Sequence, residues 1–174
     1  LKQKYGMHPL TVTWPPVIYT EIGHQNFERW IDVGGFDNIT FRPNGRVYRL
    51  LTKLSIQNLL HPFQAFIIGQ KNIAPQAALD HKIPLVFYGE NEAEYGNPIA
   101  DNSTAARSDT YHSILDIEDV YLGGVSVAQL TEQHDLSLSD LTPFLPPRQE
   151  ALDRAKVEVH YLGYYLKWTP QEAY

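Results

Sequence analysis

The chain has 174 residues, of which 20 are acidic and 14 basic, so its formal net charge is −6. Its length suits one ordinary domain, and 43% hydrophobic with 20% charged residues is typical of a globular protein, not a disordered one. The acidic balance argues against a nucleic-acid-coating role, and the absence of cysteine excludes disulfides and thiolate metal sites.

The first predicted elements alternate between helix and strand. Residues 1–6 are typical of the last turn of a helix with a glycine stop. Residues 10–14 are β-branched and aromatic, which predicts a buried strand. A helix capped by Thr20 follows and ends at Gly34-Gly35, a pair that indicates a helix stop more than a phosphate cradle. Residues 36–41 are the second predicted strand.

The clearest helix in the chain follows a turn at 43–45. Asn44 is a natural cap, and apolar residues recur at i, i+3, i+4 and i+7 from Val47 to Leu54. His61-Pro62 closes this helix, because the residue before a proline disfavours helical geometry.

The next stretch completes an α/β pattern. Residues 63–68 are apolar and fit either a strand or a buried helix. Residues 73–81 predict a helix with Pro75 in its first turn, and 84–88 predict an apolar strand. The alternation indicates a three-layer α/β unit, a parallel sheet covered by helices, in which strands 10–14, 36–41 and 84–88 are mutually parallel.

Beyond residue 96 the pattern changes. A polar loop at 97–113 precedes two predicted helices at 125–132 and 136–141 and a tyrosine-rich strand candidate at 157–166. We therefore expect an α/β core over 1–99 and a mostly helical C-terminal extension over 100–174. No apolar run approaches the roughly 20 residues of a membrane helix, so we expect no membrane span. The absence of cysteine fits the cytoplasmic location that we expect.

An acidic cluster is the most informative motif. Glu90, Glu92 and Glu94 directly follow the apolar strand at 84–88. Ligands bind at the carboxyl ends of strands in open parallel sheets, where carboxylates suit Mg²⁺ and nucleotide phosphates. A solvated turn explains the same residues equally well.

Other polar groups also leave two readings open. The segment Gly69-Gln70-Lys71-Asn72 is predicted at a helix start, where it suits an anionic ligand, or Asn72 simply caps the helix. Four basic residues form either a solvated helix face or an anion site: Arg42, Arg46, Arg49 and Lys53. The seven histidines lack metal-ligand spacing and are interpreted as ordinary surface or core residues.

These motifs occur together in an order that resembles the bacterial N-acetyl sugar amidotransferases. The two long matching runs are 61–75 (HPFQAFIIGQKNIAP) and 85–97 (LVFYGENEAEYGN). Shorter matches are 35–38 (GFDN), 43–45 (PNG), 160–165 (HYLGYY) and Trp168. The resemblance covers nearly the whole chain.

That family belongs to the PP-loop ATPases, also called adenine-nucleotide α-hydrolases. The resemblance implies a Rossmann-like parallel sheet and cleavage of ATP with Mg²⁺ between the α and β phosphates. It also implies conversion of an acetamido group to an acetamidino group on a nucleotide-linked or related sugar of lipopolysaccharide O-antigen or flagellar glycan. The implied partners are this acetamido-sugar substrate and a glutaminase that supplies ammonia, with no nucleic acid.

The resemblance assigns roles to particular residues. The resemblance places Thr11, Val12, Thr13 and Trp14 in the family's second strand, where they would contact adenine mainly through backbone atoms. Gln70 and Lys71 would face the activated substrate, with Gly69 beside the cofactor. Gly89 and Asn91 would bind the cofactor, Glu90 and Glu94 would be catalytic, and Glu94 would hold the metal.

One family motif does not occur in these residues. The pyrophosphate-gripping S-G-G-x-D-S loop is absent, and the resemblance implies that it and the first strand lie upstream of Leu1. We therefore expect the chain as given to be inactive alone. The alternatives are another PP-loop amide ligase, similar to NAD synthetase, and a non-catalytic α/β interaction module.

Overall fold

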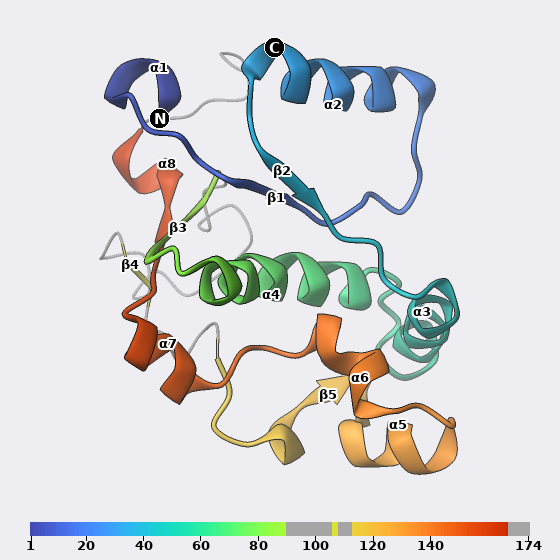
Figure 1. Cartoon of the computed structure of the whole chain (residues 1–174). Coiled ribbons are helices and arrows are strands. Elements are labelled where there is room, and N and C mark those ends of the chain that lie inside the picture. Colours follow the sequence, from blue (N-terminus) through green and yellow to red (C-terminus); the bar gives the residue numbers. More distant parts are fainter. Residues whose placement is uncertain (90–105, 108–112, 167–174) are drawn as a thin grey trace. The chain divides into compact units, whose positions relative to one another are not determined.

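A computed structural model describes residues 1–89, 106–107 and 113–166 of this mixed α/β chain (Figure 1). The chain divides into two compact units. The first comprises Leu1–Ile73 and Tyr121–Phe144, and the second comprises Ala74–Val120 and Leu145–Tyr174. The division predicted at residue 99 falls outside the described residues and stays a prediction.

The first unit begins with a parallel β–α–β arrangement. Strands β1 (Thr11–Thr13) and β2 (Asn38–Thr40) pair in parallel, with Val12 opposite Ile39. Helix α2 (Glu21–Gly34) provides the crossover that a parallel pair requires (Figure 1). Both predicted strands and the helix between them are confirmed.

Both ends of α2 follow the sequence signals. The Thr20 side chain accepts a hydrogen bond from the Gly23 N–H at 3.0 Å, and Gly35 adopts a left-handed φ of 59° to end the helix. The short helix α1 (Lys2–Tyr5) reinforces this end, because Lys2 Nζ donates to the carbonyl oxygens of Gly34 and Gly35 at 2.7 and 2.8 Å. The glycine pair is therefore a helix stop, as predicted.

Helix α3 (Gly45–Leu59) packs against a tight hairpin in the same unit. Asn44 caps the helix through its side chain. The hairpin joins β5 (Tyr121–Leu122) to β6 (Val125–Ser126) through Gly123 and Gly124, both at positive φ. A Cβ on Gly123 would lie 2.8 Å from Leu54 Cβ, so the close approach of the turn to α3 requires glycine.

Substitution of Gly123 by alanine is expected to lower the free energy of unfolding by about 2–3 kcal/mol, because left-handed strain adds to a steric clash. Gly6→Ala is the matched control. Gly6 has a φ of 64° but open space around its Cβ, so it should show the strain alone, about 1 kcal/mol. Urea unfolding of both variants measures the difference, and equal losses would contradict the packing argument.

Two short helices complete the first unit. Helices α5 (Val127–Gln133) and α6 (Leu138–Leu141) begin after Ser126 and Ser137, each of which forms a capping box. A 3₁₀ turn at Thr142–Phe144 follows, and Phe144 is fully buried. The helices predicted at 125–132 and 136–141 are confirmed, with starts set by the capping serines.

Helix α4 (Gln64–His81) decides between two open alternatives and corrects one prediction. The apolar stretch at 63–68, left open between strand and helix, is helical from Gln64. The prediction that Pro75 lies in a first turn is wrong, because 64–81 is one continuous helix with Pro75 inside it. Proline removes one backbone hydrogen bond from the helix, and the burial of its ring helps to offset that cost.

The second unit contains a different sheet. Strand β3 (Leu85–Tyr88) pairs in parallel with β7 (Glu158–Tyr161), and β4 (Ala106–Arg107) pairs antiparallel with β7. Helix α7 (Gln149–Ala155) precedes β7, and α8 (Leu162–Tyr165) follows it. The core of this unit comprises Ala78, Val86, Leu152, Val157 and Val159.

The strand partners differ from the expected single sheet. The strand predicted at 84–88 is present as β3. Among the described strands, β3 pairs with β7, and β4 pairs with the other edge of β7. Strands β1 and β2 form a separate sheet. The three-layer parallel sheet is therefore not confirmed. The candidate at 157–166 is a strand only as far as Tyr161. Within the described ranges, no helix is long and apolar enough to cross a membrane.

Candidate functional site

The polar face of the β1–β2 pair is organised by Asn38. Its Nδ2 donates to Thr11 Oγ1 at 2.8 Å and to Thr13 Oγ1 at 3.0 Å, while Thr11 Oγ1 donates to the Asp37 carbonyl at 2.8 Å. Thr40 donates to Asn38 Oδ1 at 2.7 Å. The hydroxyl groups of two residues assigned to the cofactor are therefore already engaged by a neighbouring strand.

The Trp14 side chain belongs to an aromatic cluster of the first unit. It is only 6% exposed, stacks on Phe41 at 5.5 Å between ring centroids and meets Phe144 edge-on at 5.4 Å. Gly69 lies under the same ring, where a Cβ would come within 2.2 Å of a Trp14 ring atom. Gly69 therefore has a packing role, whatever else it contacts.

The backbone of β1 remains the part that could meet a nucleotide. Thr11 and Thr13 bond to β2 through Asp37 O and Phe41 N. In a parallel pair the intervening residue directs its backbone groups to the opposite edge, so the backbone groups of Val12 face away from β2. Among the described strands none pairs with that edge. Trp14 lies at its carboxyl end, where ligands of open sheets bind.

The segment Gly69 to Asn72 does not start a helix. These residues lie well inside α4, so their N–H groups serve the helix and do not form an anion cradle. The interpretation of Asn72 as a cap is also wrong, because Asn72 is buried in the helix interior and its Nδ2 donates to the Phe144 carbonyl at 2.8 Å. What the helix offers a substrate is the side chains of Gln70 and Lys71.

Among the predicted site residues that the structure describes, Lys71 has the largest change in side-chain pKa. Burial lowers the pKa of its ammonium group from 10.5 to about 8, because the partly buried side chain loses hydration of its charged form. A weakly hydrated cation interacts strongly with an anionic ligand, and such perturbed groups concentrate at functional sites. This feature fits the role that the resemblance gives Lys71.

The lowered pKa of Lys71 predicts a pH-dependent stability. Between pH 8 and 10.5 the unfolded chain binds more protons at this residue than the folded chain, so the free energy of unfolding should rise with pH. Lys71→Met should remove that rise, and Lys53→Met, at an exposed lysine of α3, should keep it. Urea unfolding below pH 10.0 measures both slopes, since the raised pKa of half-buried Tyr48 acts oppositely above that value. Parallel slopes in all three proteins would contradict the effect of burial on Lys71.

Two polar atoms in the first unit are buried without a hydrogen-bond partner among the described groups. They are Trp14 Nε1 and Asn72 Oδ1. The indole is close enough to the Tyr48 hydroxyl to oppose the rise in the Tyr48 pKa, although it makes no hydrogen bond of good geometry.

Sequence reasoning missed the roles of Asn38 and Asn72. The Thr-x-Thr spacing of β1 and an amide within an apolar helix were the available signals.

The carboxyl end of β3 is described only as far as Gly89. Gly89 is exposed, has no positive φ, and has open space around the position of a Cβ. Glu90, Asn91 and Glu94 lie outside the described residues, so their catalytic, cofactor and metal roles stay predictions. In the part of the chain that is described, no group of three or more potential ligands could hold a metal.

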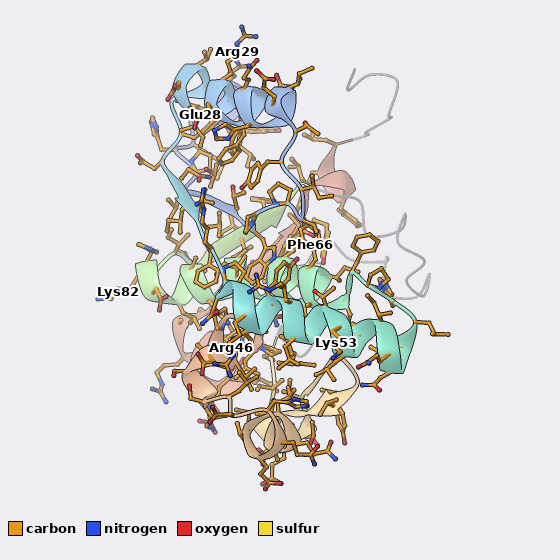
Figure 2. All side chains as sticks on the ribbon, turned by 90° about the vertical axis from the view of Figure 1, so that its right-hand side faces the viewer. Glu28, Arg29, Arg46, Lys53, Phe66 and Lys82 are labelled. Atoms are coloured by element: carbon orange, nitrogen blue, oxygen red, sulfur yellow. The ribbon has the colours of Figure 1, made fainter. Side chains whose placement is uncertain are left out.

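The basic group of α3 is a solvated face. Arg46, Arg49 and Lys53 are exposed on the helix, and Arg42 lies before its first residue, exposed as well. Figure 2 shows Arg46 and Lys53 extending from α3. Arg46 contributes to the lowered pKa of Asp140, whose main cause is its hydrogen bonding with Ser137. Nothing here gathers these cations around one anion.

Comparison with known proteins adds no family assignment. No protein-family model matches the chain, and no curated protein matches it.

Proposed function

We propose that this chain carries the core of an ATP-dependent N-acetyl sugar amidotransferase of the PP-loop type. The reaction converts the acetamido group of a nucleotide-linked or related sugar into an acetamidino group, using glutamine-derived ammonia. ATP is cleaved to AMP and pyrophosphate. The product would serve lipopolysaccharide or another surface glycan, and a glutaminase would be the protein partner.

The observation that carries the proposal is the position of Lys71, partly buried within α4 and inside the longest run that resembles the family; that burial also lowers the pKa of its ammonium group. The parallel β1–α2–β2 arrangement supports it, since this is the building unit of nucleotide-binding α/β proteins. The carboxyl end of β1 also supports it, since no described strand pairs with its outer edge and Trp14 could meet adenine there through main-chain atoms only.

The chemistry explains why a cation and an amide side chain are needed. An amide carbonyl is a poor electrophile, so its oxygen must first be adenylylated and become part of the leaving AMP. Negative charge then grows on the α-phosphate, where Lys71 would stabilise it. Gln70, exposed on the preceding position of α4, would orient the acetamido group by hydrogen bonding.

ATP with Mg²⁺ would supply the activating phosphoryl chemistry. Val12 and Trp14 would bind the nucleotide through their backbone groups. This mode of binding does not require the hydroxyl groups of Thr11 and Thr13, which are hydrogen-bonded to Asn38. Glu90, Glu94 and Asn91 have the oxygen ligands that Mg²⁺ prefers. Their assignment rests on the sequence alone.

The proposal requires an S-G-G-x-D-S loop that these 174 residues do not contain. In a longer chain that carries this loop, the strand leading into it would pair, through Val12, with the edge of β1 that no described strand occupies. Each N–H donor of such a loop can matter by about 10²-fold in rate. We therefore expect no AMP release from the 174 residues alone under conditions where the complete gene product is active. AMP release at the same rate from both would contradict this requirement.

The test uses the complete gene product with Mg²⁺–ATP, ammonia and a panel of nucleotide-linked acetamido sugars. AMP and pyrophosphate should form only with an acetamido sugar. One molecule of each should form for every acetamidino group that mass spectrometry detects. The matched controls are the same nucleotide sugars without the acetamido group. ADP as product, or AMP formation with a carboxylate acceptor instead of a sugar, would refute the proposal.

A further inference from the structure

The sequence from Asn38 to Leu79 has a charge opposite to that of the chain. It contains five basic residues and no acidic residue, although the whole chain has 20 acidic and 14 basic residues. Helix α3, in the first unit, lies within this range. The helix is therefore positive in a protein whose formal net charge is −6.

One exposed stripe of α3 is basic at its beginning and apolar at its end. Arg46, Arg49, Lys53 and Ile56 follow one another at spacings of three and four residues, which places them on one side of the helix. Leu60 continues the series at the residue that ends α3. All five residues are exposed, and Figure 2 shows Arg46 and Lys53 on this helix.

The apolar end of the stripe continues into the turn between α3 and α4. Residues 59–63 are all exposed and include Phe63, whose exposure is 52%. The turn has a defined conformation, because the Leu60 N–H donates to the Ile56 carbonyl and the Phe63 N–H donates to His61 Nδ1, both at 3.1 Å. It therefore presents an ordered apolar tip next to the basic residues of α3.

Neither the backbone nor the core explains a leucine at position 60. Its φ is 53°, in the left-handed region where a side chain is strained and where helices usually end with glycine or asparagine. Its side chain is 89% exposed, so it does not fill the core. Neighbouring exposed apolar side chains with polar residues beside them mark a surface that binds a partner.

An extended negative surface fits this arrangement. The three cations are spread along α3 and do not surround a single anion, but a bilayer with anionic lipids attracts every Lys or Arg that lies near it. Exposed Leu and Phe side chains can enter the layer between headgroups and acyl chains. An acidic protein could also neutralise the cations, but a turn of consecutive exposed residues can enter a bilayer without a matching hollow in a partner.

We propose that α3 and the α3–α4 turn bind the surface of a membrane that contains anionic phospholipids. Arg46, Arg49 and Lys53 contact the phosphate groups of the lipid headgroups. Leu60 and Phe63 enter the interfacial layer beside them. This binding is peripheral and reversible, and it does not depend on the proposed enzymatic function.

Vesicle binding by the complete gene product tests the proposal. The probes are sedimented vesicles of equimolar phosphatidylglycerol and phosphatidylcholine, and vesicles of phosphatidylcholine alone. The parent should bind the anionic vesicles more tightly, and added salt should weaken that binding because it screens exposed charges. Equal binding to both kinds of vesicle would overturn the proposal.

Charge variants test the basic half of the stripe. Arg49→Gln and Lys53→Gln should each lower the affinity for anionic vesicles about five-fold, which corresponds to about 1 kcal/mol for each basic residue near such a surface. Arg29→Gln is the matched control, because Arg29 is an exposed basic residue of α2 in the same unit (Figure 2). It should bind as the parent does. An equal loss in all three variants would mean that only the net charge matters and would overturn the assigned surface.

Leu60→Asn tests the apolar half without loss of the fold. Asparagine tolerates the left-handed conformation better than leucine, so the melting temperature should hold or rise. The affinity for anionic vesicles should fall about ten-fold, because an apolar side chain no longer leaves water on binding. Val33→Gln is the control, since Val33 of α2 is 84% exposed, and it should keep the parental affinity.

Two results would contradict the insertion of the turn. The first is unchanged affinity for anionic vesicles in Leu60→Asn. The second is a parent that does not bind anionic vesicles but forms a complex, with itself or with a purified protein partner, that Leu60→Asn abolishes. The surface would then be a protein interface, and the proposal would be wrong.

Discussion

Glu94→Gln in the complete gene product is expected to lower sugar-dependent AMP formation by about 10²-fold or more, because removal of a charged metal ligand weakens the stabilisation of departing pyrophosphate. The expected effect on stability has the opposite sign. No basic residue occurs between Tyr88 and Asn97, so three neighbouring acids repel one another without a metal. The melting temperature without ligand should therefore hold or rise.

The gain in melting temperature on adding Mg²⁺–ATP should shrink in this variant, since a ligand stabilises only in proportion to its binding. Glu28→Gln, at an exposed acid of α2 labelled in Figure 2, is the control and should behave as the parent. If the variant keeps the parental turnover and the same rise in melting temperature on adding Mg²⁺–ATP, Glu94 is a solvent-exposed residue with no role in the site.

Gly69→Ala is expected to destabilise the first unit by about 3 kcal/mol, the upper range for overpacking a core. The added Cβ would lie 2.2–2.5 Å from three ring atoms of Trp14, and that ring is fixed by Phe41 and Phe144. Gly89→Ala is the stability control, since a Cβ there meets open space. Urea unfolding monitored by tryptophan fluorescence measures both.

A second substitution distinguishes the Trp14 contact from a general loss of helix geometry. Trp14→Phe replaces the indole with a smaller ring and should recover part of the stability lost in Gly69→Ala. The coupling energy between two contacting residues commonly reaches 0.5–3 kcal/mol. Strict additivity of the two substitutions would mean that Gly69 is not required by the Trp14 ring.

Local signals in the sequence predicted local structure well. Thr20 and Asn44 cap the helices that follow them, and Gly35 ends α2 in the left-handed conformation that favours glycine. These outcomes depend on a side chain and its nearest backbone groups, so a few neighbouring residues suffice to predict them.

Features that depend on distant residues were not predictable in the same way. The partner of β3 is β7, more than 60 residues further along the chain, and alternation indicates that a strand exists without indicating which edge it joins. The continuity of α4 through Pro75 depends on burial of the proline ring, which a propensity argument does not contain.

The candidate site shows the same division. The resemblance selected Gln70 and Lys71, and only the structure shows that burial lowers the pKa of Lys71. The hydrogen bonds of Asn38 to Thr11 and Thr13 join residues 27 and 25 positions apart, respectively. The contact of His160 with Tyr165 was hidden because a predicted strand continued through residues that form α8.

The central claim, that ATP activates an acetamido oxygen, is tested most directly with oxygen-18. A nucleotide-linked sugar labelled at its acetamido oxygen is incubated with the complete gene product, Mg²⁺–ATP and ammonia, and the AMP is analysed by mass spectrometry. Adenylylation of that oxygen predicts one labelled oxygen in each AMP and none in pyrophosphate. Unlabelled AMP, or label released into water, would contradict the account.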